Sequence, residues 1–181
     1  GPLIAHLLSL KANGTFSQRQ EDQIIGGFSQ QKMRTGAATL TLTPNDLHTI
    51  DFDIQRSIQN RDGTVGKTIA DKPGRGGQPA SNSYSDYYRT EYSLNHRGEF
   101  GRVKTQSYIQ REEMNNPSRD MEAVNTTFNS INQLVLGTHN LSFGGMYLKE
   151  ELEDQGNQLV IGGQQPLSSL DRYGWALFAE D

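Results

Sequence analysis

The chain has 181 residues, of which only 33% are hydrophobic, and its mean hydropathy is −0.70. Its net charge of −4, with basic residues scattered along the sequence, gives no positive patch of the kind that nucleic-acid-binding proteins carry. The sequence has no cysteine and no run of about 18 apolar residues, which excludes a disulfide framework, a thiolate metal site and a transmembrane helix.

The first half of the chain contains three segments in which apolar and polar side chains alternate, as they do in a β-strand with one apolar face. These segments cover residues 8–17, 37–43 and 49–55. The last two are joined by the tight turn Thr43-Pro44-Asn45-Asp46, because proline presets φ and Asn and Asp favour turn geometry. A polar loop over residues 18–32 separates the first two strands, and a long irregular segment over residues 59–86 follows the third.

The second half continues the succession of strands, short turns and loops. Tyr88, Tyr92 and Leu94 mark a strand that ends at a short turn over residues 96–101, and a weaker alternation over residues 103–110 follows. A loop opens at residues 115–118, and strands are expected over residues 121–130 and 139–151 with a turn over residues 131–138 between them. A glycine-rich loop over residues 154–165 leads to a last strand that begins near Tyr173.

This succession predicts about eight antiparallel strands joined alternately by tight turns and long loops. Transmembrane β-barrels are built in this way, with short turns on one side of the membrane and long loops on the other. The low apolar content agrees, since each strand needs apolar side chains only on its lipid face. We therefore predict an all-β fold, namely an antiparallel up-and-down transmembrane β-barrel segment. Intrinsic disorder would also suit so polar a chain, but the regular alternation argues against it.

No pattern in the sequence predicts catalysis. Residues 63–68 approximate a phosphate-binding loop, but such a loop requires glycine at the position of Arg61 and a helix after Thr68. The four histidines show no metal-ligand spacing, and no serine has the Gly-x-Ser-x-Gly context of a nucleophile. Asp51 and Asp53 share one strand face and are expected to line a wet lumen, where they bond neighbouring wall or plug residues. We therefore expect no enzyme, no catalytic residue, no metal site and no cofactor.

Four segments of the chain are similar to one protein family. They are Gly1-Pro2-Leu3-Ile4, residues 36–45 with the Thr43-Pro44-Asn45 turn, His139-Asn140-Leu141 through Gly144-Gly145, and Tyr173-Gly174-Trp175-Ala176-Leu177-Phe178-Ala179-Glu180-Asp181. With these segments the chain resembles TonB-dependent outer-membrane receptors for ferric siderophores, in particular the catecholate branch that includes the colicin I and enterobactin receptors. The last segment is the most specific, and the resemblance extends nearly from end to end of the chain.

The resemblance implies a bacterial outer-membrane location and a role in transport. A ferric siderophore would bind at outward loops and at a plug domain, and energy delivered through TonB would move the plug and admit the ligand. Iron would enter only as siderophore-bound cargo. Other implied contacts are outer-membrane lipid and, at the loops, bacteriocins or phages, whereas nucleic acid is not expected.

The resemblance covers one portion of such a receptor. Large transporters of this kind have about 22 strands around a plugged lumen. Nothing in residues 1–181 resembles the plug domain or its TonB-contacting segment. The expectation is therefore that residues 1–181 are a barrel fragment, from which the plug and the remaining strands are absent.

Ferric catecholates are anionic and aromatic, so a site for them needs Arg or Lys for charge and Tyr or Trp for stacking. The long irregular segment and its edges offer such side chains, and the predicted ligand-binding residues are Arg61, Lys67, Lys72, Arg75, Tyr84 and Tyr87. In the alternative interpretation the cations are solvated loop charges, and tyrosines such as Tyr88 and Tyr92 belong to an aromatic girdle at the membrane interface.

A second hypothesis for the function comes from another class of protein. The chain could be a soluble or surface-exposed all-β binding module, for instance a sandwich, that recognises glycans or protein partners through its loops. The two hypotheses differ in where Leu8, Leu10, Leu40 and Leu42 point. In a sandwich they would face a closed, dry interior between two packed layers, and in a barrel wall they would face lipid.

Overall fold

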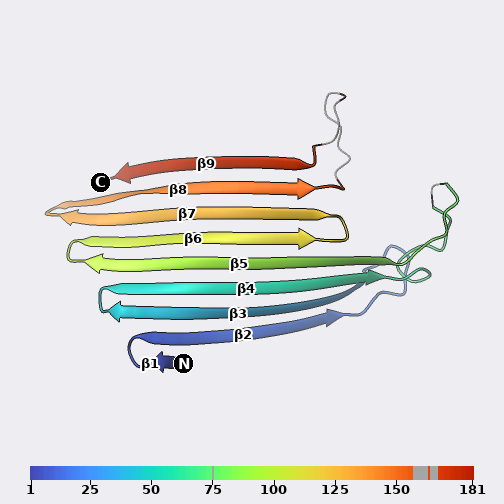
Figure 1. Ribbon diagram of the computed structural model, residues 1–181, viewed down its shortest axis with the longest axis horizontal. Helices are drawn as coiled ribbons and strands as arrows, with labels where there is room; N and C mark the ends of the chain where they lie inside the picture. Colours follow the sequence, from blue (N-terminus) through green and yellow to red (C-terminus); the bar gives the residue numbers. More distant parts are fainter. Residues whose placement is uncertain (75, 157–162, 164–166) are drawn as a thin grey trace.

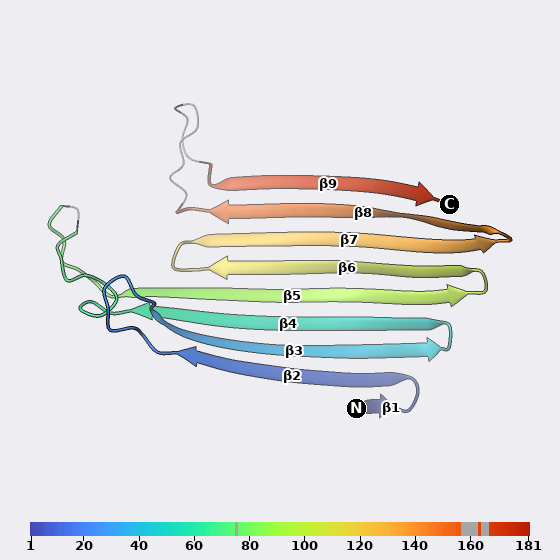
Figure 2. The ribbon, with the colours of Figure 1, turned by 180° about the vertical axis from the view of Figure 1, so that it is seen from behind.

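The computed structural model describes residues 1–74, 76–156, 163 and 167–181. These residues form one antiparallel sheet in which every strand pairs with its neighbours in sequence, as Figures 1 and 2 show from two sides. Within this part of the chain, no helix is long and apolar enough to cross a membrane. The strands are β1 (Pro2–Ile4), β2 (Leu8–Arg19), β3 (Gln30–Asn45), β4 (His48–Gly63), β5 (Ser83–Phe100), β6 (Val103–Asn116), β7 (Met121–Leu136), β8 (His139–Asp154) and β9 (Ser169–Glu180).

The prediction of an all-β, up-and-down antiparallel fold is confirmed. The strand count differs, because the described residues form nine strands, including the short β1, which pairs with β2 through Pro2 and Ser9. Most strands are also longer than predicted. The irregular segment between β4 and β5 covers residues 64–82 and not 59–86, and most of the turns expected at residues 96–101 and 131–138 belong to β5 and β7. Backbone pairing continues through polar residues, where hydrophobic alternation gives no signal.

The two ends of the sheet differ in their connections, as predicted. At one end, residues 46–47, 101–102 and 137–138 form tight turns. At the other end the longer connections begin and end, which join β2 to β3, β4 to β5 and β8 to β9 (Figure 1). We call these the short-turn end and the loop end of the sheet.

The connection between β6 and β7 departs from this rule. The sequence predicted a loop there, but residues 117–120 form a compact turn at the loop end. The amide of Arg119 donates to the carbonyl of Asn116 (3.1 Å), and the amide of Asp120 donates to the carbonyl of Pro117 (3.2 Å). Asp120 adopts a φ of 53°, a left-handed conformation that Asp tolerates better than most residues.

The sheet is open and forms a single layer. Its order runs from β1 at one edge to β9 at the other, and these two strands do not pair. Among the described residues, Ala123 is the only buried hydrophobic side chain, while Leu10 is 39% exposed. Within the described part of the chain, no second layer covers the leucines of β2 and β3. The described residues therefore do not form the two-layered sandwich of the second hypothesis.

Candidate functional site

One face of the sheet carries large apolar side chains in continuous register, and we call it the outer face. Each of these residues is the direct cross-strand partner of the next, from β2 to β9: Leu10, Leu40, Phe52, Leu94, Ile109, Phe128, Tyr147 and Trp175. They stay accessible, with Phe52 42% and Trp175 69% exposed. A row of this kind has the chemistry of a surface that meets lipid.

The apolar part of the outer face shifts along the strands from one side of the sheet to the other. On β2 the apolar surface extends toward the loop end as far as Phe16. The residue on β8 that is linked to Phe16 by successive cross-strand pairs is the charged Glu153, so the apolar surface does not reach this level on β8. On β8 it starts nearer the short-turn end, at Leu141, which pairs with Leu134. Barrel strands are tilted by about 35–45° to the membrane normal, so an apolar band parallel to the membrane must change register in this way.

The opposite face, which we call the inner face, is polar and internally hydrogen-bonded on β3, β4 and β5. Asp53 accepts hydrogen bonds from Thr39 Oγ1 (2.5 Å), Ser93 Oγ (3.1 Å) and Asn95 Nδ2 (2.9 Å). Asp51 accepts from Thr41 Oγ1 (2.6 Å) and pairs with Arg97 Nη2 (2.9 Å). Both aspartates bond neighbouring wall residues, as the sequence predicted, and their hydrogen bonds hold three strands together.

At the loop end of the inner face, two of the predicted ligand-binding residues meet. The Arg61 guanidinium carbon lies 5.3 Å from the centre of the Tyr87 ring, within the range of a cation–π contact. Tyr87 is the register partner of Gln59, two residues before Arg61 on β4. A positive charge above an aromatic ring is the combination that an anionic aromatic ligand requires.

Tyr84 does not join this pair. It lies three residues before Tyr87 on β5, and side chains an odd number apart on a strand point to opposite faces. Tyr84 is 68% exposed, and its hydroxyl accepts a hydrogen bond of 3.5 Å from Asn82 Nδ2. The structure therefore separates the two tyrosines that the sequence analysis had grouped.

Lys67 lies in the connection between β4 and β5, where it faces a carboxylate. Its Nζ is 3.8 Å from Glu21 Oε2, and Glu21 also accepts from the Thr64 amide and the Thr68 hydroxyl, both at 2.6 Å. The Thr68 hydrogen bond is the main cause that lowers the pKa of Glu21 to about 2, with help from Thr64 and Lys67. The Gly26 amide donates to the Thr68 carbonyl (2.9 Å), so residues 20–29 and 64–69 are joined. We call these contacts the Glu21 clasp.

The remaining predicted residues lie apart from these contacts. Lys72 is exposed in the connection between β4 and β5. Arg75 lies outside the described residues. Among the predicted residues that the structure does describe, Arg61 and Tyr87 form the one direct contact.

Two anchoring contacts were not predicted from the sequence. One is the Glu21 clasp, and the other joins Arg119 to Asp154 through two hydrogen bonds of 3.0 and 2.6 Å. The second contact ties the turn after β6 to the end of β8, where Asp154 is 8% exposed. The partners are far apart in the chain and share no local motif, so no signal in the sequence could have paired them.

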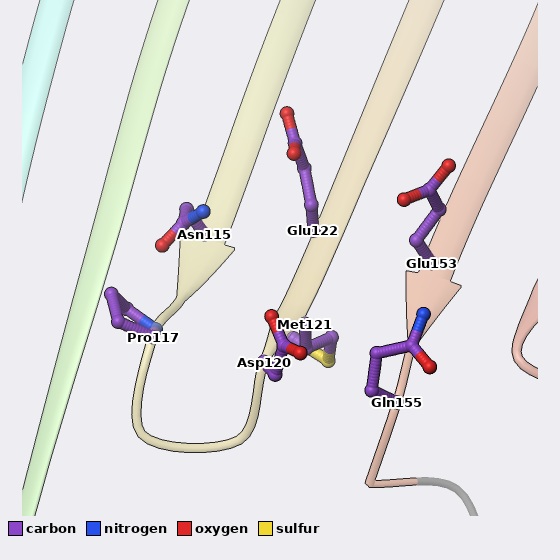
Figure 3. Close-up of a pocket in the computed structure, with 7 residues that line it drawn as sticks. All are labelled: Asn115, Pro117, Asp120, Met121, Glu122, Glu153 and Gln155. Carbon is purple, nitrogen blue, oxygen red and sulfur yellow. The ribbon is translucent and has the colours of Figure 1, made fainter.

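A shallow hollow near that turn is unsuited to an anionic ligand. Its lining includes three carboxylates, those of Asp120, Glu122 and Glu153, and Figure 3 shows the last two projecting from neighbouring strands. Asn115 and Gln155 are the nearby neutral polar side chains. Clustered negative charge repels a ferric catecholate, so this hollow is not a candidate for its site.

The histidines lie near the short-turn end, and two of them meet across strands. His48 Nδ1 and His96 Nε2 are 3.0 Å apart, the rings stack with centroids 5.4 Å apart, and Phe100 contacts His48 edge-on at 4.8 Å. Within the described residues, no group of three or more His, Cys, Asp or Glu side chains could hold a metal ion.

A single antiparallel sheet with an apolar outer face, a polar inner face and unequal ends has the architecture of an outer-membrane barrel wall. Two curated relatives agree with this class. Both are iron-regulated outer membrane virulence proteins of Vibrio cholerae serotype O1, from the classical strain O395 and the El Tor strain N16961. Each is 34% identical over 182 residues, which cover 100% of this chain.

The chain spans 27% of the length of these curated relatives. No protein-family model matches the sequence, and no solved structure matches it. The similarity along the whole chain supports an iron-related outer-membrane protein, located in the bacterial outer membrane.

Proposed function

We propose that this chain forms part of the barrel wall of an outer-membrane receptor that binds ferric siderophores and imports them with energy delivered through TonB. The main support is a combination of structure and sequence. The chain forms a sheet with a lipid-compatible outer face and a polar inner face, and its sequence is similar along its whole length to iron-regulated outer-membrane proteins. The proposal includes a plug domain through which TonB would act, and it assigns the receptor to the catecholate branch.

The ligand contact is proposed at Arg61 and Tyr87. Both are near the loop end of the inner face, where a ligand that enters from outside would first meet the wall. Arg61 supplies charge and Tyr87 supplies a ring, which together suit an anionic, aromatic ferric catecholate. Lys67 is a weaker contact, because Glu21 already neutralises part of its charge. Lys72 and Arg75 are proposed as secondary contacts, whereas Tyr84, which points to the outer face, is not; bacteriocins or phages would use the same outer loops.

The test uses the full-length protein that contains this chain, expressed in a strain without its own ferric-siderophore receptors. Radiolabelled iron is supplied as a ferric catecholate complex, and its uptake is measured in cells with and without TonB. Uptake is expected only when TonB is present. Equal uptake without TonB, or no binding of any ferric siderophore, would refute the proposal, while binding of a ferric hydroxamate alone would refute only the catecholate assignment.

Variants then test the proposed contact. Arg61→Gln is expected to weaken ferric catecholate binding by roughly tenfold or more, since hydrogen bonds to charged groups contribute about 1.5–3 kcal/mol. The matched control is Lys11→Gln, which removes an exposed cation from β2, and it should leave binding unchanged. Tyr87→Phe keeps the ring and should bind better than Tyr87→Ala. If Lys11→Gln and Arg61→Gln weaken binding equally, the contact is not at Arg61.

A further inference from the structure

A cluster of cations lies on the outer face of β3 and β4, which are neighbours in the sheet (Figure 1). Arg34 has Phe16 and Ile58 as its two register partners, and Phe16 is 62% exposed. Arg56 lies between Ile54 and Ile58 along β4, and Lys32 is the next outer-face residue of β3 beyond Arg34. The cluster therefore occupies the margin where the outer face changes from apolar to polar, on the loop-end side.

The cations of this cluster form no ion pair within the described part of the protein, although Asp62 of β4 shares the outer face with them, two residues beyond the register partner of Lys32. Arg34 and Arg56 are exposed, and neither they nor Lys32 pair with a carboxylate there. Cations at a similar level on other strands behave differently. Arg111 on β6 pairs with Glu113 and Lys149 on β8 pairs with Glu151, both at 2.7 Å. The positive charge on β3 and β4 is thus a local property of the outer face.

The surroundings of the two arginines leave them open to a ligand from the membrane side. Gly36 is the register partner of Arg56 and has no side chain that could cover it. Phe16 and Ile58 give an apolar surface beside the guanidinium groups, on which long cationic side chains can rest while their charge reaches the headgroup level. Arginine binds phosphate through paired N–H donors, which makes it suited to an anionic headgroup.

We propose that Arg34, Arg56 and Lys32 bind the phosphate groups of lipopolysaccharide, the phosphorylated glycolipid of the outer leaflet. The loop end of an outer-membrane barrel faces outside, so a cationic cluster at the loop-end margin of the apolar surface meets the outer leaflet. Basic residues near a membrane surface attract anionic lipids. A ferric siderophore is not the anion these side chains meet, because they project from the face opposite to Arg61. The inference depends on the outer-membrane orientation and not on siderophore import.

The experiment compares two double variants of the full-length protein, purified in detergent. The test variant is Arg34→Gln with Arg56→Gln. The control is Lys11→Gln with Arg102→Gln, which removes two cations, one from the inner face of β2 and one from the short-turn end. Binding of purified lipopolysaccharide and of its enzymatically dephosphorylated form is measured by native mass spectrometry, and correct folding is checked by heat-modifiable migration in gels.

The test variant should bind phosphorylated lipopolysaccharide roughly 30-fold more weakly than wild type, as expected for the loss of two charges near a membrane surface. The control should bind as wild type, and dephosphorylated lipid should bind all variants weakly. Unchanged binding by the test variant, an equal loss in the control, or full binding of dephosphorylated lipid would overturn the proposal. If the glutamine variant fails to fold, Arg34→Lys with Arg56→Lys keeps the charge and should retain most of the binding. Iron uptake measured on the same proteins separates a failure here from a failure of the transport proposal.

Discussion

Ala37 and Ala38 offer a matched test of which face of the sheet meets lipid. They are neighbours on β3 with the same side chain, but they point to opposite faces. Ala38 lies on the outer face, where its cross-strand partners are Ala12 and Ile54. Along β3 its neighbours on the same face are Leu40 and Leu42 toward the short-turn end and Gly36 toward the loop end. Ala37 pairs with Asn13 and Gln55 on the inner face.

Ala38→Arg would place a charge inside the apolar surface. Arginine on the lipid face of a barrel costs about 2–4 kcal/mol at the bilayer midplane and about 0–1 kcal/mol near the interface. The nearest native cation on this strand is Arg34, four residues away, or about 13 Å along the strand. That distance is too long for the new side chain to reach the headgroups fully, so we expect a loss of about 2 kcal/mol, roughly a 30-fold lower folding equilibrium constant. Ala37→Arg instead enters polar surroundings with Glu91 nearby, and should cost little.

The assay is urea unfolding of the full-length protein in phospholipid vesicles, followed by tryptophan fluorescence, with the free energy of unfolding compared between the two variants. The reasoning fails if Ala37→Arg is as destabilising as Ala38→Arg. It also fails if Ala38→Arg stays within about 0.5 kcal/mol of wild type, the range of ordinary surface substitutions.

Three further predictions concern the two anchoring contacts and one closely packed glycine. Because the pKa of Glu21 is lowered to about 2, the stabilisation that its carboxylate gives to the clasp should be complete above about pH 4.5 and lost as the pH falls through about 2. Glu21→Gln should speed amide hydrogen exchange in residues 64–68 at neutral pH, and unchanged exchange would argue against the clasp. Asp154→Ala removes both hydrogen bonds to Arg119 and should make residues 117–120 more sensitive to proteases than the turn at residues 137–138, which serves as the internal control. Gly144→Ala should cost about 1–3 kcal/mol in denaturant unfolding, since an added Cβ would collide with the carbonyl oxygen of Ser130, and a neutral result would mean that the backbone there shifts freely.

Much of the sheet could be read from hydrophobic alternation. The strand expected over residues 139–151 is confirmed as β8, on which Leu141 and Tyr147 share the outer face. The same method placed strand ends too early, as at the end of β4, which runs to Gly63. Alternation exists where one face meets lipid and the other meets water. Where both faces are polar, the strand continues through backbone hydrogen bonds alone, and the sequence carries no such pattern.

The candidate site shows where sequence reasoning was adequate and where it was not. Tyr84 and Tyr87 are three residues apart on β5, and this odd spacing alone places their side chains on opposite faces of the strand. The sequence was therefore sufficient to separate the two tyrosines. The pairing of Lys67 with Glu21 could not be found in this way. It depends on how two connections fold over one another at the loop end, and nothing in the local sequence of either connection specifies that arrangement.

The sequence by itself determined the class of the fold and its two-faced character, because a period of two in side-chain polarity admits only a strand with one apolar face. Tertiary structure alone decided which side chains share a register row, which cations are neutralised, and that Arg34 and Arg56 form no ion pair with any other described residue. The physical reason is that strand polarity is a local property of consecutive residues, whereas charge pairing depends on distances between residues that only the pairing of strands brings together.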